Sequence, residues 1–455
     1  MEQKSMPDRF MNFEREMALF SLQIDGVFFW KLVRSRVYNN ILKKLGLLSE
    51  SSYTVARGGW SKIRDFLRYC AVAFANMLTA FRKADILVIN HPRKVLVNGE
   101  YKDPNTDWLV EKLSKENANY LVLDMPLNWS SHPMTIGPNT RRIENFTILF
   151  KVFYKYFAQN RLDKNTTLKK ISETLKECFG SDGNILKETH DQISIFKVEY
   201  RYYLRLLRRI KPRKVWVVIG YAHHALIEAA RELSIETEEI QHGLMSKHHM
   251  NYGFNGLKNV PYFPDRMCLF GRFWYENAKL PLPEDKLDFY QNPIRKYKPG
   301  SVREPRNNKI MFLTQPIITK YITHFIDEMI ESRLFEEYDI IVKLHPSEYR
   351  VWREQQPNLE RLSEKRNITV VDSFNTPLYE LFRSVDTIVA VASTSMFEAL
   401  YFGCYVYLLS VSAIEWISSL GDIFPPPIKT PEDLACLMDN PYPNRFRVDD
   451  IFYGG

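Results

Sequence analysis

From residue 84 onward, short apolar runs rich in β-branched residues alternate with longer stretches in which apolar positions recur every three to four residues. The short runs predict β-strands and the longer stretches predict amphipathic helices. Strands are predicted at residues 85–90, 120–124, 215–219, 237–241 and 266–270, and then at 309–313, 339–344, 368–371, 387–391 and 405–409; helices are predicted at 107–117, 193–209 and 223–233. This alternation is typical of parallel sheets covered by helices.

A polar stretch at residues 298–308, KPGSVREPRNN, separates the two series of strands and predicts an interdomain linker. We therefore expect an α/β protein with two doubly wound Rossmann-like domains, at residues 84–297 and 309–455. A helical basic segment at residues 1–83 is expected to precede them. A length of 455 residues agrees with this division, because it exceeds what one ordinary core organises.

Most of the net charge of +8 lies at the N-terminal end, where residues 1–83 contain 14 Lys and Arg against 7 Asp and Glu. Such a basic segment suggests contact with a polyanion or an anionic membrane surface, or simply a charged, solvated face. Within it, residues 60–83 are apolar over half their length and are bracketed by basic residues. This pattern predicts a helix that lies in a membrane interface or one that packs on the protein body.

The composition narrows the class of protein. Hydrophobic residues at 45% and charged residues at 25% are typical of a folded globular chain. No apolar run reaches the roughly 18 residues of a membrane-spanning helix, and the first residues lack the apolar core of a signal peptide. Five cysteines without a CxxC pair argue against a disulfide framework or a zinc ribbon. We therefore expect a cytoplasmic protein.

Polar residues follow four of the predicted strands. In open parallel sheets, ligands bind beyond the carboxyl ends of the strands, so these residues are candidates for a binding site. In the first domain they are His91 and Arg93, then Gln241, His242 and Gly243, followed by His248, His249 and Tyr252. In the second domain they are Lys343, His345 and Pro346, and then Ser393, Thr394, Ser395 and Glu398. Two facing domains are expected to bring both sets to one cleft.

The second-domain residues suit a phosphate. Hydroxyls and free amides at the start of a helix bind phosphate oxygens, and Glu398, one turn later, could accept hydrogen bonds from a ribose. Alternatively, Ser395 and Glu398 form a capping box. His345, held by Pro346, can donate to a phosphate while Lys343 adds positive charge, although an incidental surface histidine is the alternative.

The first-domain residues suit proton transfer and sugar binding. His242 is expected to be the general base that activates a sugar hydroxyl. An orienting hydrogen bond or a core position are the alternatives for this histidine. Metal binding by His242, His248 and His249 is least favoured, because no carboxylate lies nearby outside the strand. His91 and Arg93 are expected to face an acceptor or an anionic donor group, or to form a merely basic loop.

Several segments, taken in order, carry a resemblance to a known family: QHG followed by histidines and YGF, then FPDRMCLFGRFW, KIMFLTQP, KLHPSE and STSMFEALYFG. They resemble bacterial GT-B glycosyltransferases of capsule and surface-polysaccharide synthesis over roughly residues 85–410. The His-Pro pair and the Ser/Thr cluster are similar to those of sialyltransferases and Kdo transferases, which use CMP-sugars. The resemblance implies that His345, Ser393, Thr394 and Ser395 hold the CMP phosphate. The acidic-acidic-Gly motif that supplies the base in many of those sialyltransferases is missing, which moves the expected base to His242.

The resemblance implies a glycosyltransferase that needs no metal and no cofactor. It would move a sugar from a nucleotide-sugar donor, CMP-sugar first, to a growing polysaccharide or glycolipid at the inner face of the membrane. No Asp-x-Asp motif occurs in the chain, in agreement with metal independence. Two other enzymes of the same fold are alternatives, a nucleotide-sugar 2-epimerase and a CDP-alcohol phosphotransferase of the teichoic-acid type. A nucleic-acid-binding protein is a remote alternative, because the basic residues lie apart from the motifs.

Overall fold

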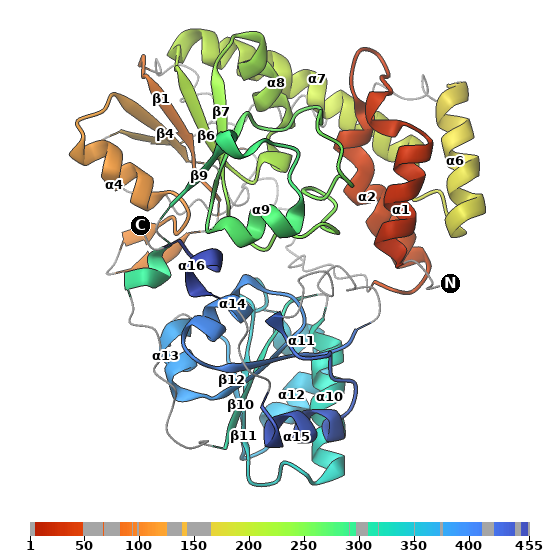
Figure 1. The fold of residues 1–455 in the computed structure, drawn as a ribbon, viewed down its shortest axis with the longest axis vertical. Coiled ribbons are helices and arrows are strands. Elements are labelled where there is room, and N and C mark those ends of the chain that lie inside the picture. The colour runs from red at the N-terminus through yellow and green to blue at the C-terminus, as the bar shows by residue number, and fades with distance from the viewer. Residues whose placement is uncertain are drawn as a thin grey trace.

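The computed structural model of the chain contains two α/β domains, one above the other in Figure 1. It describes residues 5–48, 67, 82–92, 94–97, 100–124, 139–142, 165–290, 292–296, 308–316, 318–349, 351–373, 376–411, 423–441 and 447–453. The predicted helix at 60–83 and the predicted linker at 298–308 lie almost entirely outside the described residues.

The first domain is built on a parallel sheet of seven strands in the order β5-β4-β1-β6-β7-β8-β9. The strands are β1 (Ile86–Ile89), β4 (Tyr120–Asp124), β5 (Thr140–Arg142), β6 (Lys214–Val218), β7 (Glu236–Ile240), β8 (Arg266–Leu269) and β9 (Leu287–Phe289). An antiparallel hairpin of β2 (Val95–Val97) and β3 (Glu100–Lys102) stands beside the sheet. The central strands are almost continuously apolar because helices cover both faces of the sheet.

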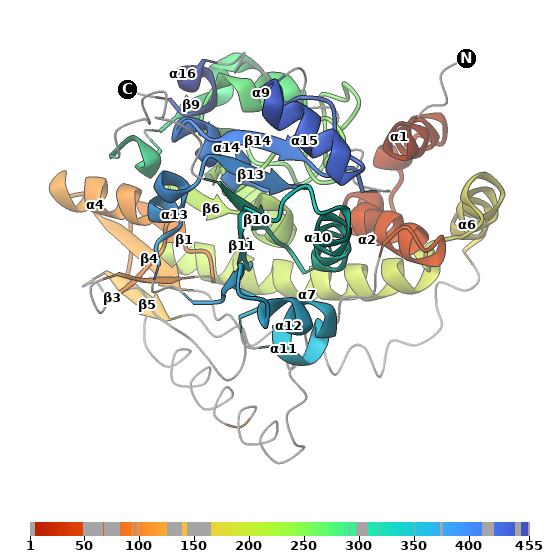
Figure 2. The same ribbon diagram turned by 90° about the horizontal axis from the view of Figure 1, so that it is seen from below.

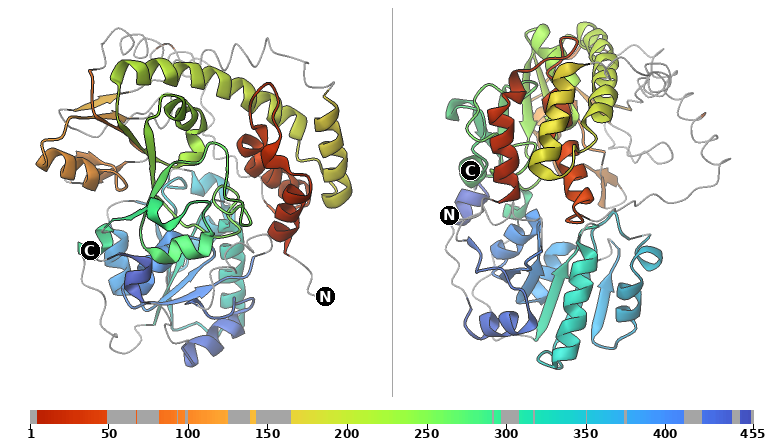
Figure 3. Two further views of the ribbon diagram at one scale, coloured as in Figure 1. Left: turned by 45° about the horizontal axis from the view of Figure 1, so that its top comes forward. Right: turned by 90° about the vertical axis from the view of Figure 1, so that its right-hand side faces the viewer.

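The helices of this domain are α4 (Asp107–Lys115), α6 (Thr166–Phe179), α7 (Ile185–Ile210), α8 (His224–Glu232) and α9 (Arg272–Ala278), with short 3₁₀ turns η3 (Gly220–Ala222), η4 (Glu284–Lys286) and η5 (Pro293–Lys296). Helix α7 begins eight residues before its predicted start and extends along the domain toward α1, α2 and α6 (Figure 3, left). Its apolar stripe, which includes Ile193 and Leu207, is buried in the core of the domain.

The N-terminal segment forms α1 (Met6–Glu16), η1 (Leu19–Ser21) and α2 (Phe29–Lys44), which share a hydrophobic core with α7. Two of its basic residues, Lys31 and Arg34, are buried. The Arg34 guanidinium pairs with Glu14 at 2.6 Å and donates a hydrogen bond to the Gly253 carbonyl at 2.9 Å. Part of the positive charge of this segment is therefore buried inside the protein. Among the described residues, no helix is both long and apolar enough to cross a membrane.

The second domain contains a parallel sheet of five strands in the order β12-β11-β10-β13-β14. Its strands are β10 (Lys309–Leu313), β11 (Asp339–Lys343), β12 (Ile368–Val371), β13 (Thr387–Ala390) and β14 (Tyr405–Leu408), and its helices are α10 (Thr319–Ser332), α11 (Trp352–Gln355), α12 (Pro357–Ser363), α13 (Leu378–Ser384), α14 (Thr394–Tyr401) and α15 (Pro431–Asp439). Figure 2 shows α10 and α13 on opposite sides of the strands. The predicted fold class, two doubly wound domains with a helical N-terminal segment, is confirmed.

The two domains meet through aromatic side chains and through the C-terminal end of the chain. The Phe397 ring of α14 lies 4.8 Å from the Trp274 ring and 5.6 Å from the Phe273 ring of α9. Helix α16 (Val448–Ile451) also packs against the first domain, where the Trp274 indole donates to the Ile451 carbonyl at 2.9 Å (Figure 1). These contacts fix how the carboxyl ends of the two sheets face each other.

Candidate active site

Each sheet has one point at which its strand order reverses. In the first sheet the chain leaves β1 toward β4 but leaves β6 toward β7, so the reversal lies between β1 and β6. In the second sheet it lies between β10 and β13 for the same reason. Connections on the two sides of such a reversal run in opposite directions and leave room for a ligand beyond the strand ends. We call these places the first and the second switch point.

Three loops bring rings together at the first switch point. His91 follows β1 and His242 follows β7; their rings lie 6.4 Å apart and are nearly parallel, at 13°. Tyr221, which follows β6, places its ring 6.0 Å from that of His242. Tyr221 was not predicted from the sequence, although its position two residues after the predicted strand at 215–219 was an available signal. Arg93, predicted to act beside His91, lies outside the described residues.

Gln241 and Gly243 shape the turn that carries His242. The Gln241 side chain is fully buried; its Nε2 donates to the Gly243 carbonyl at 2.8 Å and its Oε1 accepts from the Phe270 backbone N–H at 2.8 Å. Gln241 therefore fixes the turn from inside, whereas the sequence analysis predicted that it contacts a sugar. A Cβ atom placed on Gly243 would lie 3.6 Å from the Thr394 hydroxyl, so this turn directly adjoins the second domain.

A group of buried titratable residues lies behind the turn. The Tyr252 hydroxyl donates to Glu239 Oε1 at 2.5 Å, and the Gly220 backbone also hydrogen-bonds this carboxylate. Burial raises the pKa of Glu239 to about 7, and burial together with Glu239 raises the pKa of Tyr252. Tyr252 is thus a buried partner of Glu239, not a side chain open to a sugar.

The two remaining predicted histidines differ in their surroundings. His248 is buried, and its Nε2 lies 2.9 Å from the Asp8 carboxylate of α1, so it ties the N-terminal helices to the loop after β7. The His249 ring lies 5.0 Å from the Tyr252 ring. Burial lowers the pKa of His249 to about 4, and the nearby positive charge of Arg34 adds to this effect. His249 is therefore neutral near pH 7.

His345 has a defined tautomer at the end of β11. The Ser347 backbone N–H donates to His345 Nδ1 at 3.2 Å. Because that nitrogen accepts, the ring proton is on Nε2, which leaves Nε2 as a donor. The predicted neighbour Pro346 is exposed and follows directly in the same turn. The geometry suits donation to an anionic oxygen.

Glu348 organises the turn that holds His345. This carboxylate is completely buried and accepts hydrogen bonds from the Thr314 hydroxyl at 2.6 Å, the Thr319 hydroxyl at 2.5 Å and the His345 backbone N–H at 3.1 Å. Burial raises its pKa, while these hydrogen bonds oppose the rise. It belongs to the KLHPSE segment, but the sequence analysis gave it no role, because Thr314 and Thr319 lie some thirty residues earlier in the chain.

Lys343 is the last residue of β11 and is mostly buried. Its Nζ donates to the Leu344 carbonyl at 3.3 Å and to the Tyr349 hydroxyl, and it lies 4.6 Å from the centre of the Tyr349 ring. Burial lowers the pKa of Lys343 to about 8. Because the pKa of Lys343 is only slightly above neutral pH, a nearby phosphate would raise this pKa and stabilise the charged form of the side chain.

The hydroxyl cluster lies at the second switch point, at the start of α14. Ser393 is the N-cap of the helix, and its Oγ accepts from the Ser395 backbone N–H at 3.2 Å. The alternative in which Ser395 caps the helix is therefore wrong. Glu398 accepts hydrogen bonds from the Tyr379 hydroxyl at 3.2 Å and from the Ser395 side chain, and burial raises its pKa to about 7.

Gln315 joins the two strands that flank the second switch point. It follows β10, and its Nε2 donates to the carbonyl of Ala392 after β13. The sequence analysis did not single out this residue, although its place two residues after the first strand of the domain was visible. The link holds the hydroxyl cluster beside the end of β10, which also carries Thr314.

The two switch points adjoin each other. A Cβ atom placed on Gly243, in the turn after β7, would lie 3.6 Å from the hydroxyl of Thr394, at the start of α14. Within the part of the chain that the structure describes, no three His, Cys, Asp or Glu side chains are grouped so that they could hold a metal ion.

The sequence matches no protein-family model and no curated protein. Among solved structures, it is similar to the UDP-GlcNAc 2-epimerase of Methanocaldococcus jannaschii in complex with UDP-GlcNAc and UDP, at 12% identity and a TM-score of 0.46 over 81% of this chain and 95% of that one. The UDP-GlcNAc 2-epimerase from Neisseria meningitidis bound to UDP-GlcNAc gives 13% identity and a TM-score of 0.44 over 78% and 91%. A variant of the wall teichoic acid polymerase TagF gives 11% and 0.40 over 87% and 90%.

Proposed function

We propose that this chain is an enzyme that binds a nucleotide sugar between the two switch points and breaks the bond between the sugar and the nucleotide phosphate. We further propose that it transfers the sugar to an acceptor hydroxyl. The observation that supports this is the direct approach of the Gly243 turn to the Thr394 hydroxyl, because it puts a candidate base and a candidate phosphate site side by side.

The second domain would stabilise the departing nucleotide. Negative charge grows on the phosphate oxygen as the bond to the sugar breaks, and preorganised donors aimed at that oxygen lower the barrier. The candidate donors are the His345 Nε2–H and the hydroxyls of Ser393 and Thr394 at the start of α14. The Ser395 hydroxyl, which hydrogen-bonds Glu398, would have to turn toward the phosphate. Glu398, once ionised, would accept hydrogen bonds from the ribose hydroxyls.

The first domain would activate the acceptor. In the transfer step, the acceptor oxygen bonds to the anomeric carbon, the bond from that carbon to the phosphate oxygen breaks, and the hydroxyl proton passes to His242. The nearly parallel His91 ring lies beside His242 on the same side of the site. Aromatic neighbours such as Tyr221 would exclude water from the base, which limits hydrolysis of the donor.

A thermal-shift screen with CMP, UDP, GDP and CDP tests nucleotide binding, because a ligand that binds only the native state raises its apparent stability. We expect one nucleotide to raise the Tm by several degrees, CMP first because of the resemblance to CMP-sugar enzymes. The variant His345→Ala should lose the shift, whereas His324→Ala, at an exposed histidine of α10, should keep it. If none of the four nucleotides raises the Tm, the proposal fails; if His345→Ala keeps the shift, His345 has no part in the site.

A nucleotide-sugar 2-epimerase is the second candidate. Inverting a carbon requires a proton to be removed from one face and returned to the other, so it uses two proton-carrying groups, and His91 and His242 form such a pair. Incubation with UDP-GlcNAc alone separates the candidates. An epimerised product without any acceptor would support the epimerase, whereas donor consumption that depends on an added glycan would support transfer.

A further inference from the structure

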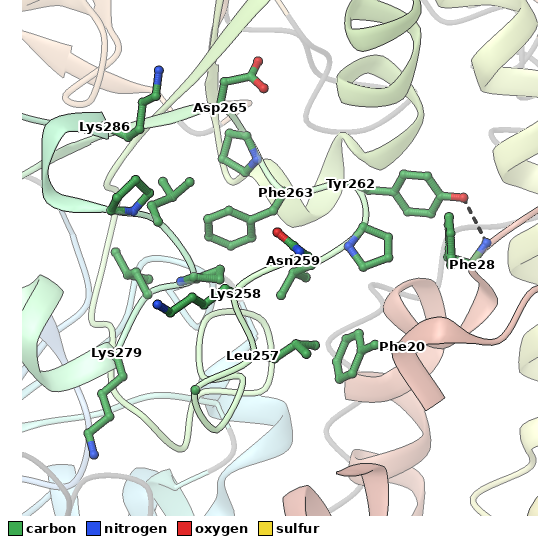
Figure 4. Close-up of a pocket in the computed structure, with 18 of the residues that line it drawn as sticks. Phe20, Phe28, Leu257, Lys258, Asn259, Tyr262, Phe263, Asp265, Lys279 and Lys286 are labelled. Carbon is green, nitrogen blue, oxygen red and sulfur yellow. Dashed lines mark hydrogen bonds between the residues drawn. The ribbon is translucent and has the colours of Figure 1, made fainter. Parts of the chain in front are cut away.

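A groove of about 1220 Å³ lies on the first domain between the N-terminal helices and the segment from 256 to 286 (Figure 4). None of the residues assigned above to the nucleotide or to proton transfer lines it. The volume exceeds the roughly 300–1000 Å³ of ordinary small-molecule pockets. We call it the lysine groove because Lys258, Lys279 and Lys286 line it.

One part of the lysine groove is apolar. Figure 4 shows Phe20, Phe28 and Leu257 at one end, with Phe263 farther along. Leu257 is 38% exposed, which is unusual for a large apolar side chain in this fold. The Phe28 backbone N–H donates to the Tyr262 hydroxyl at 3.0 Å, so the N-terminal helices and this loop form one fixed wall.

The other part of the groove carries three lysines. In the described part of the chain, none of the three forms an ion pair. Figure 4 shows Lys286 and Lys279 spread along the side away from Phe28, with their side chains pointing in opposite directions and Lys258 between them. Three acids line the groove: Glu276, which is exposed and lies three residues before Lys279, and two that are already engaged. Glu228 pairs with Arg231 at 2.7 Å, and Asp265 accepts from the Thr237 backbone N–H and hydroxyl at 2.8 and 2.7 Å.

Helix α9 connects the lysine groove to the proposed active site. One face of α9 packs Phe273 and Trp274 against Phe397 of α14, whose first residues carry the hydroxyl cluster. Tyr275 lies in the same helix and Lys279 is its C-cap residue, and both side chains line the groove. A ligand held on the lysine side would therefore lie one helix away from the junction of the two domains.

We propose that the lysine groove binds an amphipathic lipid phosphate, with its long apolar chain on the phenylalanine and leucine side chains and its phosphate on the side of the groove that carries the lysines. Apolar surface on one side of the groove and lysines without an ion pair on the other match this ligand in both polarity and charge. The binding of a lipid phosphate in the groove is independent of the proposed function. The further idea that this lipid phosphate carries the sugar acceptor rests on the proposed function.

Calorimetric titration of the full-length protein with dodecyl phosphate, below its micelle concentration, tests the binding. Dodecyl maltoside is the control for the chain without the charge, and inorganic phosphate is the control for the charge without the chain. We expect dodecyl phosphate to bind at least tenfold more tightly than either control. Equal binding of dodecyl maltoside, or equal binding of inorganic phosphate, would overturn the proposal.

Matched variants locate the site. The triple variant Lys258→Gln, Lys279→Gln, Lys286→Gln should weaken dodecyl phosphate binding at least tenfold. Lys169→Gln, Lys170→Gln, Lys187→Gln, at exposed positions of α6 and α7, removes the same charge and should leave binding unchanged. Equal weakening in both would mean that net charge alone attracts the ligand, and would overturn the proposal. Leu257→Ser should also weaken binding, because it removes exposed apolar surface from the groove; unchanged binding would contradict the apolar contact.

The nucleotide screen keeps this proposal separate from the proposed function. In the triple-lysine variant the nucleotide-dependent rise in Tm should persist, which would also demonstrate that the variant is folded. Dodecyl phosphate binding without any nucleotide effect would contradict the proposed function and leave the groove assignment standing. A nucleotide effect without dodecyl phosphate binding would contradict the groove assignment alone.

Discussion

The two switch points occupy the same place in their sheets but present different chemistry. The first is lined by the rings of His91, His242 and Tyr221, with neutral or nearly neutral buried groups behind them. The second presents hydroxyls and helix amides around Ser393, beside the ring of His345, whose Nδ1 accepts a hydrogen bond from the Ser347 backbone N–H. The doubly wound topology therefore fixes where a ligand can bind, while the side chains decide whether that place handles protons or anions.

Both places depend on a buried glutamate, but the two glutamates do different work. Glu348 accepts three hydrogen bonds that hold the His345 turn directly. Glu239 accepts a hydrogen bond from the Tyr252 hydroxyl and so supports the loop that follows β7. Burial raises both pKa values, so neither glutamate is a simple surface acid. Both glutamates are therefore positioning residues in the proposed site.

The largest effect is expected at the first switch point. The variant His242→Ala should lower transfer by about 10²–10⁴-fold, since this is the usual contribution of a positioned general base. The nucleotide-dependent rise in Tm should stay nearly unchanged, because the residues proposed to bind the phosphate belong to the other domain. His324→Ala, which removes an exposed histidine, is the matched control. Survival of transfer in His242→Ala would place the base elsewhere.

The next effect concerns the positioning role of Glu348. Glu348→Ala leaves the Thr314 hydroxyl without its acceptor, at a cost of about 1–3 kcal/mol of unfolding free energy. The Thr319 hydroxyl keeps the Gln315 carbonyl and the His345 N–H keeps the Thr314 hydroxyl oxygen as acceptors. We expect lower stability in urea unfolding together with weaker nucleotide binding. Glu232→Ala, which removes an exposed carboxylate paired with Arg208, should cost less than about 1 kcal/mol. Equal losses in the two variants would rule out a positioning role.

The pH dependence of nucleotide affinity should distinguish two second-domain groups. Ribose binding requires ionised Glu398, whose pKa is about 7, so affinity should rise as pH increases from 6 to 7.5. Lys343 loses its positive charge above its pKa of about 8, so affinity should then fall, by about tenfold per pH unit at most for each group. Glu398→Gln should remove the acidic limb and Lys343→Met the alkaline limb. A flat profile in the unmodified protein would contradict both roles.

The smallest effect is expected where α1 meets the loop after β7. Burial raises the pKa of Asp8, but hydrogen bonds from Ser5 and His248 outweigh this and leave it below its usual value. Asp8→Asn should therefore lower the unfolding free energy by no more than about 1 kcal/mol, because the carboxylate is 46% exposed. Thermal unfolding at pH 7 measures this, with Asp25→Asn, at an exposed aspartate paired with Lys197, as control. A loss of several kcal/mol would mean that the contact carries more of the fold than its exposure suggests.

Ten of the twelve strands of the two sheets could be predicted to within one or two residues, and most of these are compact apolar runs with polar flanks; β7, with the sequence ETEEI, is an exception. The runs at 120–124 and 309–313 have the same bounds in the structure. The strands β5 and β9 were not predicted, since each has only three residues and lies at a sheet edge. The return of α16 to the first domain was also not predicted, because a four-residue helix has no periodicity to detect.

The candidate site was predictable in part. Residues immediately after strands, such as His242 and His345, could be found because topology directs them to one edge. The buried positions of Gln241 and Tyr252 and the role of Glu348 could not, because they depend on partners that only the folded chain supplies. In such cases a polar residue next to a motif looks the same in sequence whether it faces a ligand or holds the loop from inside.

A crystal structure of the protein with the nucleotide that gives the largest thermal shift would decide whether the nucleotide binds between the two switch points. We expect the phosphate to lie within hydrogen-bond distance of His345 Nε2 and of the hydroxyls at the start of α14. We expect His242 to face the position of the sugar. A nucleotide bound away from both switch points, or one whose phosphate contacts neither His345 nor Ser393, would contradict these expectations.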